Sequence, residues 1–412
     1  MPLALGLAIA SGFPPIAGII ASVVGGVMVA VLGGSYVTIT GPGNGLVVVL
    51  LGAVTVLGEG DMQAGYLYAL AAVILSGGVL LLFGFLRFGS LSDFFPATAI
   101  QGMLSAIGIT ILLKQLYVMF GDLETKGAAL ELLLGVPTLI QTLFTDGSTG
   151  QWYAAGIGVV SLLIMVFYSK IRNRFFHLVP APMWVVLLAL GFDAYFSFVG
   201  GGNPISKSLL ISLPENLLGG VPTPNFSKLN QPAFWGVVVS ITLISSIESL
   251  LSIKAVDKLD PQKRRSNTNK DMKALGLATI VSGFLGGMNV VTVIARSSVN
   301  VNNQASNRSA NFFHAAFLFV MVLVFQDQLR RIPLTSLAAI LVYTGYKLAA
   351  PAIFVRMYQI GKEQLLVFLT TLISTLLTDL ITGILIGLLT TFVVHVLLNK
   401  AFWLFSRNLL KP

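Results

Sequence analysis

Two ionisable residues lie inside long apolar stretches of the sequence, where charged side chains are rare. Glu248 lies in ITLISSIESLLSIK, with Ser245 one helical turn before it, and Arg296 lies in VIARSSVN. If these stretches cross a membrane, burying either charge costs several kcal/mol, so each residue is a candidate for binding. Arg296 could hold an anion, whereas Glu248 could bind Na⁺, carry a proton or neutralise Arg296. The alternative is structural: a paired or surface-reaching arginine, and a hydrogen-bonded acid.

A glycine-rich segment offers a second kind of anion-binding group. Residues 31–42 read VLGGSYVTITGP, and GNG follows. Gly41 and Gly43 would let a ligand approach the backbone closely. Thr40 suits a helix cap or a hydroxyl ligand, and Pro42 suits the first turn of a helix. Because the N-terminus of a helix binds anions, the segment predicts an anion site. The alternative is an ordinary small-residue contact between helices.

This segment has an internal counterpart. Residues 284–296 read FLGGMNVVTVIAR, so both copies have Leu-Gly-Gly, a β-branched run and then a helix start. β-branched residues continue a helix poorly, so each copy predicts a short strand followed by a half-helix. Ala295, Arg296 and Ser297 then occupy the first turn of the second half-helix. Half-helices that meet at the membrane midplane are typical of inverted-repeat transporters.

The elements that position these residues must be membrane helices. Only 10% of the 412 residues are charged, against roughly 25% in a soluble domain, and 55% are hydrophobic. The mean hydropathy is +0.88. This composition excludes a soluble globule and a disordered chain, and the continuous apolar stretches argue against an outer-membrane barrel. An all-α polytopic membrane protein remains.

Apolar segments divide the chain into about fourteen transmembrane segments, if short ones covered by protein are included. They are residues 1–13, 15–33, 42–57, 62–86, 95–120, 151–169, 180–198, 232–253, 273–287, 293–303, 309–326, 332–349, 364–378 and 380–399. The two repeat copies open the third and the tenth segments. The two copies are therefore seven segments apart. Because seven is an odd number, the second copy must cross the membrane in the opposite direction to the first. Between the fifth and sixth segments, GAALELLLGVPTLIQTLF predicts an amphipathic helix at the membrane surface.

The basic residues predict the orientation. Between the eighth and ninth segments lie Lys254, Lys258, Lys263, Arg264, Arg265, Lys270 and Lys273. Because cytoplasmic loops are enriched in Lys and Arg, this connection is expected to be cytoplasmic, as are both termini. The net charge of +9 is therefore explained by basic residues that orient a multi-pass protein in the plasma (inner) membrane, and no nucleic-acid partner is expected.

Other chemistry has little support. Asp379, between the last two segments, is better suited to cap a helix than to bind a ligand. The three histidines have no metal-ligand spacing. No P-loop, nucleophile elbow or metalloprotease helix occurs, so an enzyme is not indicated. No cofactor is expected, apart from Na⁺ or H⁺ as a coupling ion.

Taken together, the motifs resemble the sulfate permease (SulP) family of anion transporters. They are P-x-x-L-G-L-A-x-A-S-G-x-P-P-x-x-G from Pro2 to Gly18, T-G-P at Thr40–Pro42, S-I-E-S-L-L at Ser246–Leu251, and I-A-R-S-S-V-N at Ile294–Asn300. The resemblance implies a 7+7 inverted-repeat fold with a core domain (residues 1–86 and 232–326) and a gate domain (residues 87–231 and 327–412). It also implies elevator-like movement of the core, usually within a homodimer.

The resemblance places the substrate between the third and tenth segments, with the first and eighth nearby. The residues implied are Leu3, Leu7, Thr40, Gly41, Pro42, Gly43, Glu248, Ala295, Arg296 and Ser297. Leu3 departs from the polar residue that some members have. Members usually carry an N-terminal segment before the first span and a C-terminal STAS domain. Since Met1 falls within the first-span motif, we expect a trimmed chain or a partial gene.

The expected function is cation-coupled transport of a small oxyanion across the lipid bilayer: bicarbonate, sulfate or a dicarboxylate. Glu248 and Ser245 would serve the coupling ion, with Glu248 a candidate Na⁺ ligand. One alternative is a passive anion channel or uncoupled exchanger. Another is a nucleobase–cation symporter of similar fold, although such proteins tend to use additional carboxylates where this sequence has Arg296.

Overall fold

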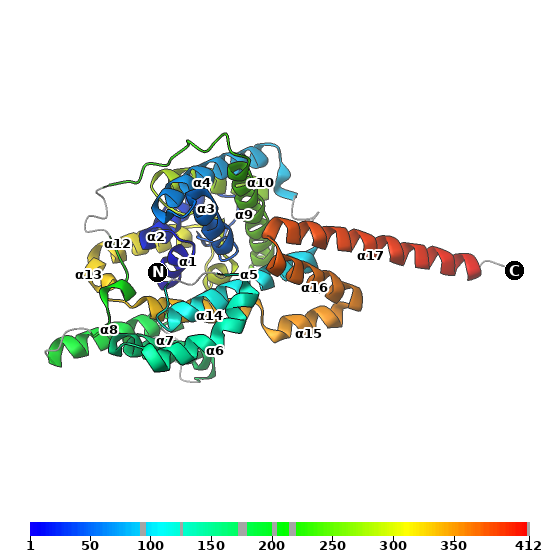
Figure 1. The fold of residues 1–412 in the computed structure, drawn as a ribbon. Coiled ribbons are helices and arrows are strands. Elements are labelled where there is room, and N and C mark those ends of the chain that lie inside the picture. Colours follow the sequence, from blue (N-terminus) through cyan, green and yellow to red (C-terminus); the bar gives the residue numbers. More distant parts are fainter. Residues whose placement is uncertain (91–95, 124–126, 172–178, 200–203, 214–219, 410–412) are drawn as a thin grey trace.

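The computed structural model describes residues 1–90, 96–123, 127–171, 179–199, 204–213 and 220–409. In this part, each segment predicted to cross the membrane contains a helix (Figure 1). In the first half these are α1 (Pro2–Ala10), α2 (Pro15–Leu32), α3 (Val47–Gly58), α4 (Met62–Phe85), α5 (Ala97–Met119), α7 (Thr149–Phe167) and α8 (Ala181–Val199). In the second half they are α9 (Pro232–Leu259), α10 (Thr268–Phe284), α11 (Ile294–Asn302), α12 (Ser309–Val324), α14 (Leu334–Leu348), α16 (Lys362–Leu377) and α17 (Leu380–Leu409).

In the described part of the chain, three further α-helices lie largely outside the predicted spans. The amphipathic run between the fifth and sixth segments forms α6 (Ala129–Asp146), which confirms that it is helical. The sequence analysis missed α13 (Gln326–Arg330) and α15 (Pro351–Ile360). Helix α15 begins at a proline and ends before Gly361, the usual start and stop residues, but it is too short and too polar for a hydropathy search.

Two short strands interrupt the helices at the positions predicted from the repeat. β1 (Thr40–Gly41) pairs antiparallel with β2 (Val291–Thr292), so that Thr40 faces Thr292 and Gly41 faces Val291. All four residues are buried. Because non-helical backbone at membrane depth must be covered by protein and hydrogen-bonded, this pairing explains how helices as short as α3 and α11 are tolerated.

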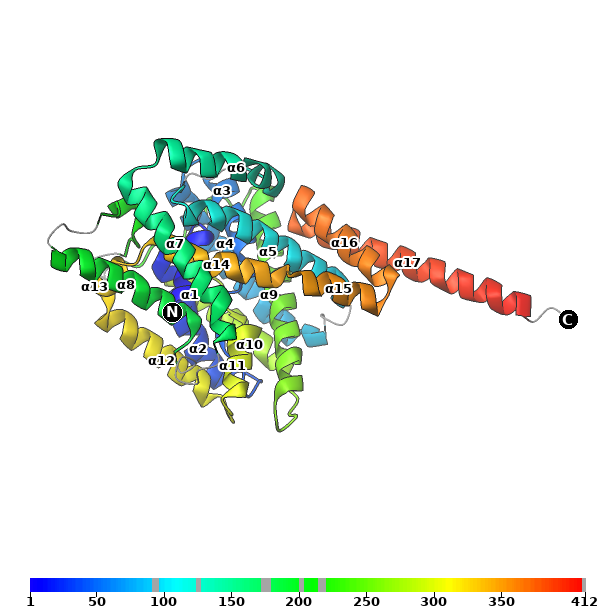
Figure 2. The same ribbon diagram turned by 90° about the horizontal axis from the view of Figure 1, so that it is seen from below.

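The helix packing repeats itself across the two halves. Helix α2 packs against α12, and α4 packs against α10 (Figure 1). If helices seven spans apart are equivalent, α2 corresponds to α10 and α4 corresponds to α12. The α2–α12 contact and the α10–α4 contact are then equivalent by the internal repeat. The strand pair joins equivalent segments and therefore lies on the axis that relates them. Elsewhere, α5 packs against both α14 and α16 (Figure 2).

The long helices match the thickness of a bilayer. Within the described residues, eight helical stretches are long and apolar enough to cross a membrane. The far end of α17 extends away from the other helices in both views (Figures 1 and 2). Many large apolar side chains on the outer faces are exposed, among them Phe198, Phe317 and Phe392. Such a surface is stable in lipid and not in water.

The predicted orientation can be tested with a single cysteine, because the sequence contains none. Gln262 is exposed in the connection between α9 and α10, so Gln262→Cys should react with a membrane-impermeant maleimide only from the cytoplasmic side. Ser227, exposed just before α9, provides the matched control: Ser227→Cys should react only from outside. Labelling of Gln262→Cys in sealed cells would contradict the orientation.

Candidate functional site

Arg296 lies in the first turn of α11 and reaches across to the other repeat. Its Nη1 donates a hydrogen bond of 3.2 Å to Ser22 Oγ on α2. A Cβ atom added to Gly41 would lie 2.5 Å from the same Nη1, so the guanidinium packs directly against the glycine backbone of β1. Among the described residues, Arg296 forms no ion pair within 4.0 Å. In this part of the chain, its guanidinium therefore contacts one neutral hydroxyl and no carboxylate within ion-pair distance.

Glu248 lies on α9 beside the continuation of the same glycine segment. Its Oε1 accepts a long hydrogen bond of 3.5 Å from the Gly45 backbone N–H. Cβ atoms added to Gly43 and Gly45 would lie 2.6 and 2.9 Å from Oε2. Residues 41–45 thus separate the two charged groups, with Arg296 at one end and Glu248 at the other. In the described part of the chain no ion pair joins the two groups, so direct neutralisation of Arg296 by Glu248 is not observed.

Several buried oxygens on Glu248 and on the two repeat segments accept no hydrogen bond from the residues that the structure describes. They are Glu248 Oε2, Asn44 Oδ1, Asn289 Oδ1 and Thr292 Oγ1. Oxygens of carboxylate, amide and hydroxyl groups are the ligands that hard cations prefer. Unsatisfied buried acceptors are rare because each costs about 1–3 kcal/mol. Their chemistry is of the type that a small hard cation prefers, and the Glu248 carboxylate could supply the compensating charge.

The serines that flank Glu248 hold the second repeat in place. Asn289 Nδ2 donates to Ser245 Oγ at 2.9 Å, and the Thr292 N–H donates to Ser249 Oγ at 3.3 Å. Residues at these spacings share one helix face. Ser245 was predicted to serve the coupling ion; in the structure, its hydroxyl oxygen accepts from Asn289 and so positions one of the unpartnered amide oxygens.

Two local predictions for the first half-helix are wrong. Thr40 lies in β1 and does not cap a helix, and Pro42 is not in a first helical turn because α3 begins at Val47. The reason is the strand pairing: β2 holds Thr40 and Gly41 extended, and the chain must then turn through residues 42–46 before α3 can start. The substrate role assigned to Thr40, Gly41, Pro42 and Gly43 stays a prediction.

The remaining predicted residues differ in accessibility. Leu7 is buried in the main apolar cluster, and Leu3 is half-buried at its edge. Ala295 is exposed in the first turn of α11, whereas Ser297 is buried: its Oγ accepts from the Ile39 N–H at 2.9 Å and lies 2.7 Å from the Val293 carbonyl. Ser297 therefore joins the strand segments and does not point into open space.

Sequence reasoning missed a residue that fixes the strand pair. Asn311 on α12 is buried; its Oδ1 accepts from the Thr40 N–H at 3.1 Å, and its Nδ2 donates to Thr40 Oγ1 at 3.1 Å. Ser22, the partner of Arg296, was also missed. Both are polar residues inside otherwise apolar spans, which is the signal that could have identified them.

Asn311→Ala should destabilise the protein. The substitution leaves the buried Thr40 N–H without its side-chain acceptor, which costs about 1–3 kcal/mol. We expect a lower midpoint of thermal unfolding in detergent, together with weaker anion binding at a loosened β1. Asn303, exposed directly after α11, is the matched control, and Asn303→Ala should change the midpoint little. An unchanged midpoint for Asn311→Ala would show that the Asn311 amide does not hold β1.

Two half-helices that follow paired strands, with buried charges beside them, define a membrane permease built from inverted repeats. Comparison with known proteins identifies which one: the chain belongs to the sulfate permease family, which matches residues 1–371. This confirms the family resemblance seen in the motifs. It also places the chain among permeases and not among enzymes.

Relatives in bacteria match most of this chain. YvdB of Bacillus subtilis (strain 168) is 26% identical over 352 residues, covering 85% of this chain and 62% of that protein. The bicarbonate transporter BicA of Picosynechococcus sp. (strain ATCC 27264 / PCC 7002 / PR-6) is 26% identical over 372 residues, covering 89% of this chain and 62% of BicA. The chain thus spans less than two thirds of the length of either relative.

Solved structures confirm the fold. The transmembrane domain of a cyanobacterium bicarbonate transporter BicA superposes with a TM-score of 0.79 at 23% identity, covering 93% of each chain. SLC26A9 superposes with a TM-score of 0.80 at 16% identity, covering 96% of this chain and 63% of that chain. Both have the 7+7 inverted-repeat fold, so the predicted fold class is confirmed.

Proposed function

We propose that this chain carries small oxyanions across the membrane as a secondary active transporter. The observation that carries the proposal is Arg296: a guanidinium at membrane depth, packed on bare glycine backbone, with no ion pair among the described residues. A permanent, unneutralised cation in such a place is costly unless an anion binds beside it. A planar guanidinium matches carboxylate-like oxyanions by paired hydrogen bonds.

The candidate substrates are bicarbonate, sulfate and small dicarboxylates. Membership of the sulfate permease family and the likeness to the bicarbonate transporter BicA support the first two. The anion would bind beside the Arg296 guanidinium, which packs against Gly41, whereas Gly43 is covered by the Glu248 carboxylate. Ala295 is exposed in the first turn of α11. Leu3 and Leu7 would form an apolar wall on α1.

Coupling to a cation is proposed at Glu248. The buried oxygens of Glu248, Asn44, Asn289 and Thr292 that accept no hydrogen bond within the described residues fit Na⁺, and a carboxylate in the same place can instead carry H⁺. A cation bound beside Glu248 would place two positive charges near the anion, one at each end of residues 41–45. Anion and cation would then favour each other's binding, which is the thermodynamic basis of symport.

Movement is proposed to divide the chain as the resemblance implies. The core, residues 1–86 and 232–326, contains both strands and both charged groups, so it would carry the site past a gate formed by residues 87–231 and 327–412. The functional unit is proposed to be a homodimer in the plasma (inner) membrane, with both termini in the cytoplasm.

Uptake into proteoliposomes tests the proposal. Labelled bicarbonate, sulfate and succinate should be compared with and without inward Na⁺ and H⁺ gradients. Accumulation of one anion that requires a cation gradient supports symport. Anion flux that does not depend on either cation gradient would indicate the uncoupled exchanger or channel. Uptake of labelled uracil, and not of these anions, would indicate a nucleobase symporter.

A further inference from the structure

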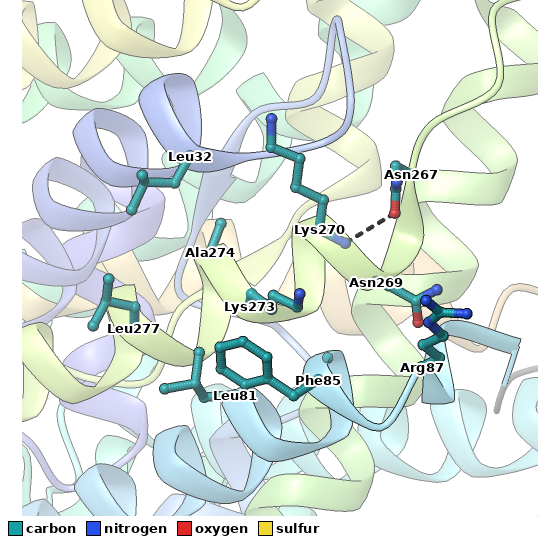
Figure 3. Close-up of a pocket in the computed structure, with 11 residues that line it drawn as sticks. Leu32, Leu81, Phe85, Arg87, Asn267, Asn269, Lys270, Lys273, Ala274 and Leu277 are labelled. Atoms are coloured by element: carbon teal, nitrogen blue, oxygen red, sulfur yellow. Dashed lines mark hydrogen bonds between the residues drawn. The ribbon is translucent and has the colours of Figure 1, made fainter.

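A first cavity, which none of the site residues described above lines, lies where three helix ends meet. It has a volume of about 880 Å³ and is lined by residues from the end of α2, the end of α4 and the start of α10. Figure 3 shows the side chains around it, with Lys270 and Lys273 coming from α10 and Arg87 from the residue pair that follows α4. The charge pattern predicts that this end of all three helices is cytoplasmic.

The charge of the cavity has one sign. Arg87, Lys270 and Lys273 line it, and no Asp or Glu does among the described residues. In that part of the chain none of the three cations forms an ion pair within 4.0 Å. Lys273 Nζ lies 4.4 Å from the centre of the Phe85 ring, a contact that leaves its charge unneutralised. The nearest acid in the sequence, Asp271, is turned away: its Oδ1 accepts from the Gly34 and Ser35 N–H groups.

The neighbouring cavity is also basic, but one of its cations is paired with an acid. It shares Arg87 and Asn269 with the first cavity. There, Arg264 is paired with Asp260 at 2.7 Å, and Asp257 accepts from the Ser266 N–H at 2.9 Å. Within the described residues, Arg87, Lys270 and Lys273 form no such ion pair, so their charge is available to a ligand.

Two asparagines add hydrogen-bond donors. Asn267 Oδ1 accepts from the Lys270 N–H at 3.0 Å, and Asn269 Oδ1 accepts from the Gly89 N–H at 2.7 Å. Both amide oxygens are thus used, and within the described residues neither side-chain NH₂ group donates a hydrogen bond. Cationic groups with free N–H donors are the usual recognition chemistry for a phosphate oxygen.

Arg87 reaches the cavity at a conformational cost. Its φ angle is +65°, in the left-handed region that glycine normally occupies at this position after a helix. A side chain with a β-carbon is disfavoured there, and arginine has no local hydrogen bond that would compensate as asparagine can. The strain is consistent with a demand for the guanidinium at the mouth of the cavity.

The rest of the cavity lining is largely apolar. Leu32, Leu81, Phe85, Ala274 and Leu277 line it, and Phe85 and Leu32 are 63% and 41% exposed at the ends of two spans. A small soluble anion would make no favourable contact with these apolar side chains. A lipid places its phosphate at the headgroup level and its acyl chains on the adjacent apolar surface.

We propose that this cavity binds the phosphate group of an anionic phospholipid from the cytoplasmic leaflet. Arg87, Lys270 and Lys273 would contact the phosphate, with Asn267 and Asn269 as neutral donors. Phe85 and Leu32 would contact the acyl chains. The site is separate from Arg296 and Glu248, so its test does not depend on the transported substrate.

Native mass spectrometry of the full chain in detergent can measure the lipid directly. Phosphatidylglycerol should bind in preference to phosphatidylcholine. In the triple variant Arg87→Gln/Lys270→Gln/Lys273→Gln, affinity for phosphatidylglycerol should fall roughly a hundredfold, since each cation near an anionic lipid contributes about fivefold. Unchanged phosphatidylglycerol affinity in this variant would overturn the proposal.

A charge-matched control separates a site from general attraction. The triple variant Lys347→Gln/Arg356→Gln/Lys362→Gln removes the same charge from the region between the twelfth and thirteenth spans, which includes α15. Because this region follows an even number of spans from a cytoplasmic N-terminus, it is also predicted to be cytoplasmic. It should bind phosphatidylglycerol like the wild type. An equal loss of affinity in this control would show that net charge alone attracts the lipid, and would overturn the site.

Two further measurements address the cavity and the acyl chains. Leu81→Trp keeps every cation but fills the cavity, so it should reduce phosphatidylglycerol binding; retained binding would place the lipid elsewhere and overturn the assignment. Glycerol 1-phosphate carries the headgroup phosphate without acyl chains and should not displace the lipid at equal concentration. Displacement at equal concentration would show that a free phosphate compound suffices, which contradicts a lipid site.

Discussion

Arg296→Ala is expected to weaken binding of the transported oxyanion by about ten- to a hundredfold. The physical reason is the loss of a charge-assisted hydrogen bond, worth about 1.5–3 kcal/mol. The fold should survive, because Arg296 contributes one hydrogen bond to Ser22 and, within the described residues, no ion pair. Equilibrium binding of labelled sulfate and bicarbonate to purified protein measures the effect.

The chemistry of the guanidinium can be separated from its charge. Arg296→Lys should recover only part of the affinity, since an ammonium lacks the planar pair of donors. Arg356→Ala removes an exposed arginine from α15 and should leave binding unchanged. Wild-type affinity in a well-folded Arg296→Ala protein would assign this arginine to structure and remove the main support for the proposed anion site.

Glu248→Gln is expected to abolish accumulation driven by a cation gradient, while slow anion exchange can persist. The substitution keeps the size of the side chain but removes the charge that compensates the cation. The neutral oxygens of Asn44, Asn289 and Thr292 cannot replace that charge. Uptake into proteoliposomes with imposed gradients measures the loss, and Glu363→Gln, an exposed acid on α16, is the matched control. Full gradient-driven uptake by Glu248→Gln would exclude Glu248 as the coupling residue.

The same assay distinguishes the coupling ions. A proton-coupled carrier is driven by an inward proton gradient in the absence of Na⁺, whereas a Na⁺-coupled carrier is not. The double variant Arg296→Ala/Glu248→Gln tests whether Glu248 only neutralises Arg296. If the two groups stabilised each other, removing both side-chain charges would destabilise the protein less than removing one. Because no ion pair joins them in the described residues, we expect no such recovery of stability.

The positions of the spans and strands could be predicted because each depends on local sequence. Apolar length determines where a helix can cross a bilayer, and the β-branched run after Leu-Gly-Gly determines where the chain must leave the helix. Asp379 was also predictable as a cap: its Oδ1 accepts from the Ile381 and Thr382 N–H groups at 2.8 and 3.0 Å.

What sequence could not predict depends on contacts between distant segments. The start of α3 is displaced to Val47 because β2 holds Thr40 and Gly41 extended, and periodicity carries no information about that partner. The hydrogen bond between Arg296 and Ser22 joins residues 274 positions apart. Local sequence likewise could not show that Ser297 is used for backbone contacts, or that Glu248 and Arg296 lie at opposite ends of one glycine segment without pairing.

The pairing of Thr40 with Thr292 also has a consequence for biosynthesis. A ribosome adds about 5–20 residues per second, so the 252 residues from position 40 to position 292 take roughly 10–50 s to synthesise. During that time the first strand has no partner, although its backbone groups must be satisfied within or near the bilayer. The N-terminal half therefore has to wait in an incomplete state, covered by water, lipid headgroups or the insertion machinery. A nascent chain stalled before residue 291 should lack the anion site entirely, whatever the state of its first helices.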